Sequence, residues 1–134
     1  MHSDPEIGEV INRFFCALDD ADYESCCSAF SDQGSWHRQG KLLQGAEMIR
    51  SALQDRGTEF LTRHLITNMV RRTVEEETAE VSFYSTVFAH RGPTAGAPPA
   101  SGAPSVLAVY RASLVRERGT WRIKSLRSTP TFRN

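Results

Sequence analysis

Hydrophobic residues recur at helical spacing in the first part of the chain. Ser3 and Glu6 match a capping box with Pro5 in the first turn, and they predict a helix that runs to about Leu18. Asp22 can cap a second, short helix. The apolar stripe of the first helix is formed by Ile7, Val10, Ile11, Phe14, Phe15 and Leu18, and that of the second by Tyr23, Cys26, Cys27 and Phe30.

A turn and a third helix follow. Gln39-Gly40 separates two short extended segments, 34–38 and 41–43, and predicts a tight turn between them. Gly45 can begin a helix, Glu47 in its first turn suits the helix dipole, and Gly57 can end it. The buried face expected for this helix is Met48, Ile49, Ala52 and Leu53.

Beyond Gly57 the apolar residues alternate with a period of two, which predicts strands. Four are expected, at 62–73, 79–90, 105–116 and 121–126, joined by hairpins into a mainly antiparallel sheet. Residues 92–104 contain four prolines and three glycines, and we interpret them as a flexible surface loop, with a flap over a pocket as the alternative. Helices followed by strands favour the α+β class, here as a single domain over 1–134.

Composition narrows the range of partners. The 16 basic and 16 acidic residues give a formal net charge of zero, so we expect no nucleic acid as partner. No apolar run reaches the ~20 residues that a membrane span needs, so no membrane is expected either. The N-terminus does not resemble a signal peptide, and three unpaired cysteines suit a reducing cytoplasm. The four histidines show no metal-ligand spacing.

Two segments carry candidate chemistry. His64 lies on a predicted strand, where it shares one face with Ile66, Asn68 and Val70. His64 and Asn68 would lie ~13 Å apart along that face, at two depths of one pocket. Asp19 and Asp20 stand where the first helix ends, although carboxylates are unfavourable at a helix C-terminus. Such departures concentrate at functional sites, but solvated loop residues would explain them as well.

The order of these segments resembles one family. Leu18-Asp19-Asp20-x-Asp22-Tyr23, then Trp36, Gly40 and Gly45, then Thr62-Arg63-His64-x-x-x-Asn68 and Gly119-x-Trp121-Arg122-Ile123 are similar to SnoaL-like proteins of the nuclear transport factor 2-like (cystatin-like) superfamily. The resemblance covers nearly the whole chain. It implies a curved sheet that forms a cone around an apolar cavity and is closed by the N-terminal helices. It also implies a homodimer that associates through the outer face of the sheet.

Several members of that superfamily are cofactor-free lyases or isomerases, such as scytalone dehydratase, hexachlorocyclohexane dehydrochlorinase and bile-acid dehydratase. The resemblance implies that Asp19 pairs with His64 and that neither a metal nor a cofactor takes part. A neutral imidazole is a suitable base near pH 7, and a buried carboxylate would fix its tautomer. The expected substrate is a small hydrophobic molecule with a ring. Expected binding residues are Tyr23, Trp36, Asn68, Tyr84 and Tyr110, although such aromatic residues are often ordinary core.

Two features leave an alternative open. Scytalone dehydratase has a second histidine on the following strand, where this chain has Ser82 and Tyr84. The Leu-Asp-Asp and Thr-Arg-His-x-x-x-Asn segments are also similar to the small subunit of ring-hydroxylating dioxygenases, which has the same fold and no catalytic residues. The alternative is therefore a non-catalytic ligand-binding or subunit-like domain. The sequence does not decide which of Asp19, Asp20 and Asp22 faces His64.

Overall fold

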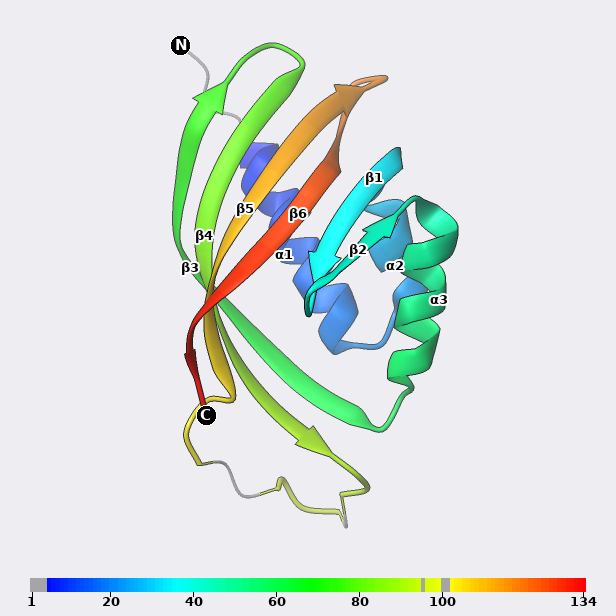
Figure 1. The fold of residues 1–134 in the computed structure, drawn as a ribbon, viewed down its shortest axis with the longest axis vertical. Coiled ribbons are helices and arrows are strands. Elements are labelled where there is room, and N and C mark those ends of the chain that lie inside the picture. The colour runs from blue at the N-terminus through cyan, green and yellow to red at the C-terminus, as the bar shows by residue number, and fades with distance from the viewer. Residues whose placement is uncertain (1–4, 95, 100–101) are drawn as a thin grey trace.

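A computed structural model describes residues 5–94, 96–99 and 102–134 of the chain. Within these residues it contains three helices and six strands (Figure 1). In chain order they are α1 (Pro5–Asp19), α2 (Tyr23–Ser28), β1 (Phe30–Arg38), β2 (Lys41–Gln44), α3 (Ala46–Arg56), β3 (Phe60–Val74), β4 (Thr78–Arg91), β5 (Val106–Glu117) and β6 (Thr120–Arg133). The predicted α+β class is confirmed, while Ser3 of the expected capping box lies outside the described residues.

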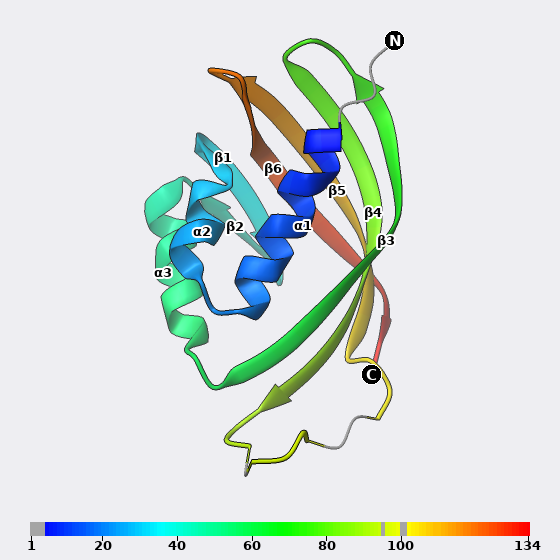
Figure 2. The ribbon, with the colours of Figure 1, turned by 180° about the vertical axis from the view of Figure 1, so that it is seen from behind.

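All six strands belong to one curved sheet with the order β2-β1-β6-β5-β4-β3. The pairings are antiparallel except that of β1 with β6, which is parallel. The four long strands β3 to β6 follow one another by hairpins and curl around α1, as the two opposite views show (Figures 1 and 2). The predicted curved and mainly antiparallel sheet is therefore confirmed.

Helix α1 lies on the concave side of the sheet (Figure 2). Its stripe of Ile7, Ile11, Phe14, Phe15 and Leu18 is buried. The Phe15 ring meets the rings of Phe83 and Tyr110 edge-on, with centroids 5.9 and 5.4 Å apart. Burying such side chains stabilises the fold by about 1.5–3 kcal/mol each. Strands β3 and β4 continue past the end of α1 (Figure 1), so the helix packs against only part of their length.

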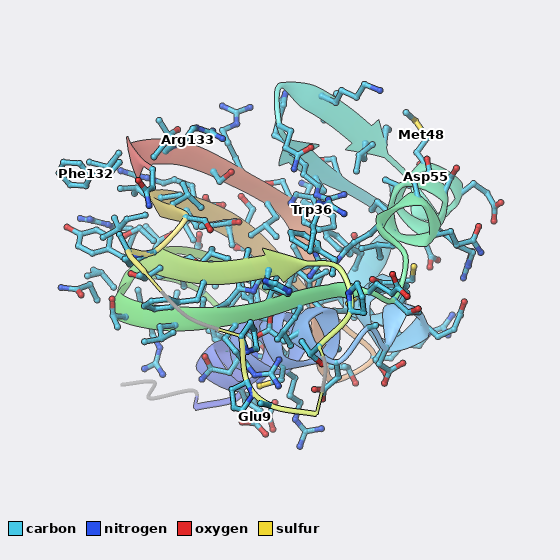
Figure 3. The ribbon with its side chains drawn as sticks, turned by 90° about the horizontal axis from the view of Figure 1, so that it is seen from below. Glu9, Trp36, Met48, Asp55, Phe132 and Arg133 are labelled. Carbon is cyan, nitrogen blue, oxygen red and sulfur yellow. The ribbon has the colours of Figure 1, made fainter. Side chains whose placement is uncertain are left out.

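Helix α2 lies between α1 and α3, and α3 packs next to β1 and β2 (Figure 2). Asp22 caps α2 as predicted, because its side chain accepts a hydrogen bond from the Ser25 N–H. Gly45 and Gly57 flank α3, also as predicted. Met48 is 48% exposed and points away from the molecule (Figure 3), so its predicted burial is wrong. The buried face of α3 is narrower than expected and consists of Ile49, Leu53 and Arg56.

Two strand limits differ from the prediction. Phe30 begins β1 and does not continue α2. Strand β6 runs to Arg133, well beyond the predicted end at Leu126. Residues 127–133 show no apolar alternation, but they pair with β5 as far as Val106 opposite Arg133. Backbone pairing with a neighbour, rather than side-chain pattern, therefore extends this strand.

The described residues of 92–104 form no helix or strand. Among the residues that the structure describes, no helix is long and apolar enough to cross a membrane.

Candidate active site

The end of α1 brings a carboxylate onto β3. Asp19 Oδ1 lies 2.6 Å from His64 Nδ1, and Asp19 Oδ2 accepts a hydrogen bond of 2.9 Å from the His64 backbone N–H. Both side chains are almost buried, with 9% and 8% of their surface exposed. Ala21 adopts a φ of 58° at the turn after the helix, which lets the chain reverse directly behind Asp19.

The other two aspartates face elsewhere. Asp20 is exposed, and Asp22 binds Ser25 at the start of α2. Of the three carboxylates that the sequence left open, Asp19 is thus the one that contacts His64.

Two residues extend this contact into a chain of four. The Thr62 hydroxyl donates to Asp19 Oδ1 over 2.8 Å, and Arg56 Nη2 donates to the Thr62 oxygen over 2.7 Å. Thr62 is 1% exposed and Arg56 is 9% exposed. In this series of hydrogen bonds Arg56 donates to Thr62, and Thr62 donates to Asp19. The carboxylate is therefore held by Thr62 on one side and by His64 on the other.

The hydrogen bonds that Asp19 accepts keep its carboxylate ionised. Burial by itself would raise the pKa of Asp19, but the hydrogen bonds and the charge of His64, together with the hydrogen bond from Thr62, outweigh burial and lower it below its ordinary value. An ionised carboxylate only accepts hydrogen bonds, so His64 Nδ1 must carry the proton in the 2.6 Å contact. When the His64 ring is neutral, its lone pair therefore lies on Nε2.

His64 lines a cavity of about 580 Å³ beyond the end of α1. The wall has an apolar part and a polar part. The apolar part includes Leu18, Trp36, Phe60, Val87, Ala89, Val106, Ala108, Tyr110 and Pro130, and the polar part includes Arg38, Gln39, Arg56, Thr62, His64, Ser105, Ser128 and Arg133. The cavity is therefore less uniformly hydrophobic than the sequence led us to expect.

The structure places the five predicted binding residues differently. Trp36 and Tyr110 line the cavity, and Trp36 lies well inside the molecule (Figure 3). Tyr23 is not part of the cavity wall, and its hydroxyl donates to the Gly57 carbonyl, which ties α2 to the end of α3. Tyr84 is 42% exposed on the outer face of the sheet.

Asn68 does not share the His64 face, so that prediction is wrong. The β3–β4 register shifts between Thr67 and Val70, and Asn68 takes a φ of 56° at this bulge. The bulge leaves Asn68 exposed and turns Met69 inward against the core. Asn68 is accordingly absent from the cavity wall.

Residue patterns alone did not reveal the contacts of Thr62 and Arg56. Thr62 reads as an ordinary strand residue two positions before His64, and Arg56 as a basic residue in the last turn of a helix. Only the burial of Arg56 distinguishes it, and burial of an arginine is not visible in sequence. The β4 residue opposite His64 is Val87, so no second histidine stands beside the first.

No group of three or more His, Cys, Asp or Glu side chains that could hold a metal occurs within residues 5–94, 96–99 and 102–134. The chemistry that the arrangement supports directly is proton transfer by an oriented imidazole.

A family model described as a SnoaL-like domain matches residues 1–127. A proposed scytalone dehydratase from Novosphingobium aromaticivorans is similar in structure, with a TM-score of 0.82 at 18% identity over 97% of this chain and 85% of that one. A nuclear transport factor 2-like protein with a cystatin-like fold from the same organism gives a TM-score of 0.75 at 21% identity, over 95% of this chain and 80% of that one.

A proposed aromatic ring hydroxylase from that organism gives a TM-score of 0.81 at 15% identity, over 96% of this chain and 88% of that one. At these identities the likeness to solved structures establishes a shared fold. No curated protein matches the sequence.

Proposed function

The chain belongs to the family of SnoaL-like domains, and from this membership and its site we propose that it is a cofactor-free lyase, isomerase or cyclase. Its substrate would be a small molecule with a hydrophobic ring, from which His64 removes a proton. The observation that carries the proposal is the contact of 2.6 Å between Asp19 and His64 at the wall of a cavity. A buried acid–imidazole pair next to open space is a general-base arrangement.

The proposed step begins with neutral His64. Its Nε2 lone pair takes a proton from a carbon next to a carbonyl or another electron-withdrawing group. The resulting imidazolium is stabilised by ionised Asp19, which already holds the Nδ1 proton. Loss of a leaving group, migration of a double bond or ring closure completes the reaction, and the imidazolium then returns its proton.

Thr62 and Arg56 serve as positioning residues in this scheme. They donate hydrogen bonds along the chain to Asp19 and fix the carboxylate against the imidazole. Positioning of this kind matters because a misplacement of 1 Å can cost on the order of 10²-fold in rate.

The second candidate is the non-catalytic domain. The structural likeness to a proposed aromatic ring hydroxylase is the observation that favours it. A purely architectural Asp–His pair needs no open space beside the ring. His64 lines a cavity of about 580 Å³, which supports the catalytic candidate over this one.

An activated carbon acid tests the proposal without knowledge of the natural substrate. A base that removes the C3 proton of 5-nitro-1,2-benzisoxazole opens the ring: the C–H electrons form the nitrile, the N–O bond breaks, and its electrons go to the oxygen, which becomes the phenolate of the same product molecule. We expect the wild-type protein to catalyse this opening. His64→Gln should lower the rate by on the order of 10²-fold or more, because the base is lost.

His37→Gln is the matched control. His37 lies on β1 between Trp36 and Arg38, two residues of the cavity wall, and its ring approaches Arg127 instead. Its replacement should leave the rate unchanged. A His64→Gln protein that is folded, as judged by circular dichroism, and retains the wild-type rate would rule out the proposed base.

A further inference from the structure

The wall of the cavity carries positive charge that no acidic residue on the wall balances. Arg38 at the end of β1, Arg56 at the end of α3 and Arg133 at the end of β6 all line it. No aspartate or glutamate is found among the described residues that line the cavity. Asp19 lies behind the wall, where His64 and Thr62 already occupy its oxygens.

Arg56 is fixed in place by several contacts, although its Nε has no hydrogen-bond partner among the described residues. Its Nη2 donates to Thr62 and, over 3.5 Å, to the Leu18 carbonyl, and its guanidinium lies 4.7 Å from the centre of the Phe60 ring. The residue is 9% exposed. Its Nε is buried and has no hydrogen-bond partner among the described residues. An unsatisfied donor of a buried charged group is costly, so the positive charge of Arg56 is incompletely compensated by the protein around it.

Arg38 is a second guanidinium without a counter-ion. It lies 5.1 Å from the centre of the Trp36 ring and forms no ion pair within the described part of the chain. Burial, followed by the repulsion of Arg56, lowers the pKa of Arg38. Both effects disfavour a positive charge at this place, and the attraction of an anion bound in the cavity would offset them.

We propose that the substrate carries a carboxylate, which the guanidinium groups of Arg38 and Arg56 bind inside the cavity. The planar guanidinium matches the two oxygens of a carboxylate, and such charge-assisted hydrogen bonds are among the strongest in proteins. Trp36 and Tyr110 offer apolar surface for the ring of the same molecule. The two arginines hold the carboxylate end of the substrate. That the ring end faces His64 rests on the proposed function.

A pair of ligands that differ in charge tests this proposal by binding alone. Isothermal titration calorimetry of the full chain at pH 7.5 compares the affinity for 2-naphthoate with that for 2-naphthamide, which has the same ring system but no charge. We expect 2-naphthoate to bind at least tenfold more tightly than the amide. Arg38→Gln should lower the affinity for 2-naphthoate at least tenfold and leave the affinity for 2-naphthamide unchanged, because only the anion binds the guanidinium.

Two further variants separate charge from architecture. Arg71→Gln removes an exposed arginine outside the cavity wall and should leave both affinities unchanged. Arg38→Lys retains the charge and should keep part of the preference for the anion, which is informative if Arg38→Gln does not fold. Equal affinities of the wild type for the two ligands, no measurable binding of 2-naphthoate, or an equal loss for both ligands in Arg38→Gln would overturn the proposal.

The outcome is independent of the proposed base. His64→Gln should still bind 2-naphthoate more tightly than 2-naphthamide, even though it no longer catalyses the opening of the benzisoxazole ring. If the preference is absent while the benzisoxazole reaction still requires His64, the carboxylate proposal fails and the proposed function stands. The reverse result would leave an anion-binding cavity without a catalytic base.

Discussion

The Asp19 carboxylate accepts three hydrogen bonds, from the ring and the backbone of His64 and from Thr62. These bonds serve both the fold and the site, because they join the end of α1 to β3 and also set the tautomer of the imidazole. The sequence allowed Asp19 and His64 to be identified through a family resemblance. Thr62 and Arg56 could not be given roles, since their importance depends on burial and on contacts between residues distant in the chain.

Asp19 should make the stability of the protein depend on pH. Its pKa in the folded protein is below the ordinary 3.8, so its contribution is present above that value and is lost as the pH falls through the lower folded pKa. We expect Asp19→Asn to reduce the free energy of unfolding by about 1–3 kcal/mol at pH 5. The difference from wild type should shrink as the pH falls towards about 3.

Urea denaturation of both proteins across this pH range measures the effect. Asp20→Asn is the matched control, because Asp20 is exposed at the same helix end, and it should change little. A difference between wild type and Asp19→Asn that stays constant down to pH 3 would show that the carboxylate is not held ionised.

At the scale of elements, the bulge in β3 decides which side chains face the interior. Alternation predicted that Asn68 would follow His64 and Ile66 on one face, and it failed because one extra residue breaks the period of two. Asparagine tolerates the left-handed region better than most residues, so Asn68 was the available signal for the bulge. The helices and hairpins were predictable because their caps, turns and periodicity lie within short stretches of sequence.

The backbone at Asn68 can be tested by substitution. Its φ of 56° is unfavourable for a β-branched residue, so Asn68→Val should cost about 1–2 kcal/mol of stability. Asn68→Gly should be close to neutral, because glycine adopts positive φ without strain. Equal unfolding midpoints of the two variants in urea would contradict a left-handed residue at this bulge.

At the scale of the whole molecule, the outer face of the sheet carries exposed apolar side chains. Leu65 and Tyr84 are 48% and 42% exposed there, on the neighbouring strands β3 and β4. Exposed apolar side chains of this kind favour association, and the family resemblance predicts a homodimer through this face. The sequence of one chain cannot establish a partner, because the contacts that decide association are shared between two surfaces.

Sedimentation equilibrium tests the predicted dimer. We expect the wild-type chain to be dimeric, and the double variant Leu65→Glu with Tyr84→Glu to be monomeric, because buried like charges would repel across the interface. Met48→Glu is the control, since Met48 is 48% exposed on α3, and it should remain dimeric. A monomeric wild type would refute the prediction.

We infer that Asp19 holds His64 with its proton on Nδ1 and its lone pair on Nε2, where a base is needed. Long-range ¹H–¹⁵N NMR of the chain labelled at histidine reads the protonation of both ring nitrogens directly. At pH 8 we expect a protonated Nδ1 and an unprotonated Nε2 for His64, and loss of this preference in Asp19→Ala. A wild-type His64 ring with its proton on Nε2 would show that Asp19 does not set the tautomer and that Nε2 is not the base.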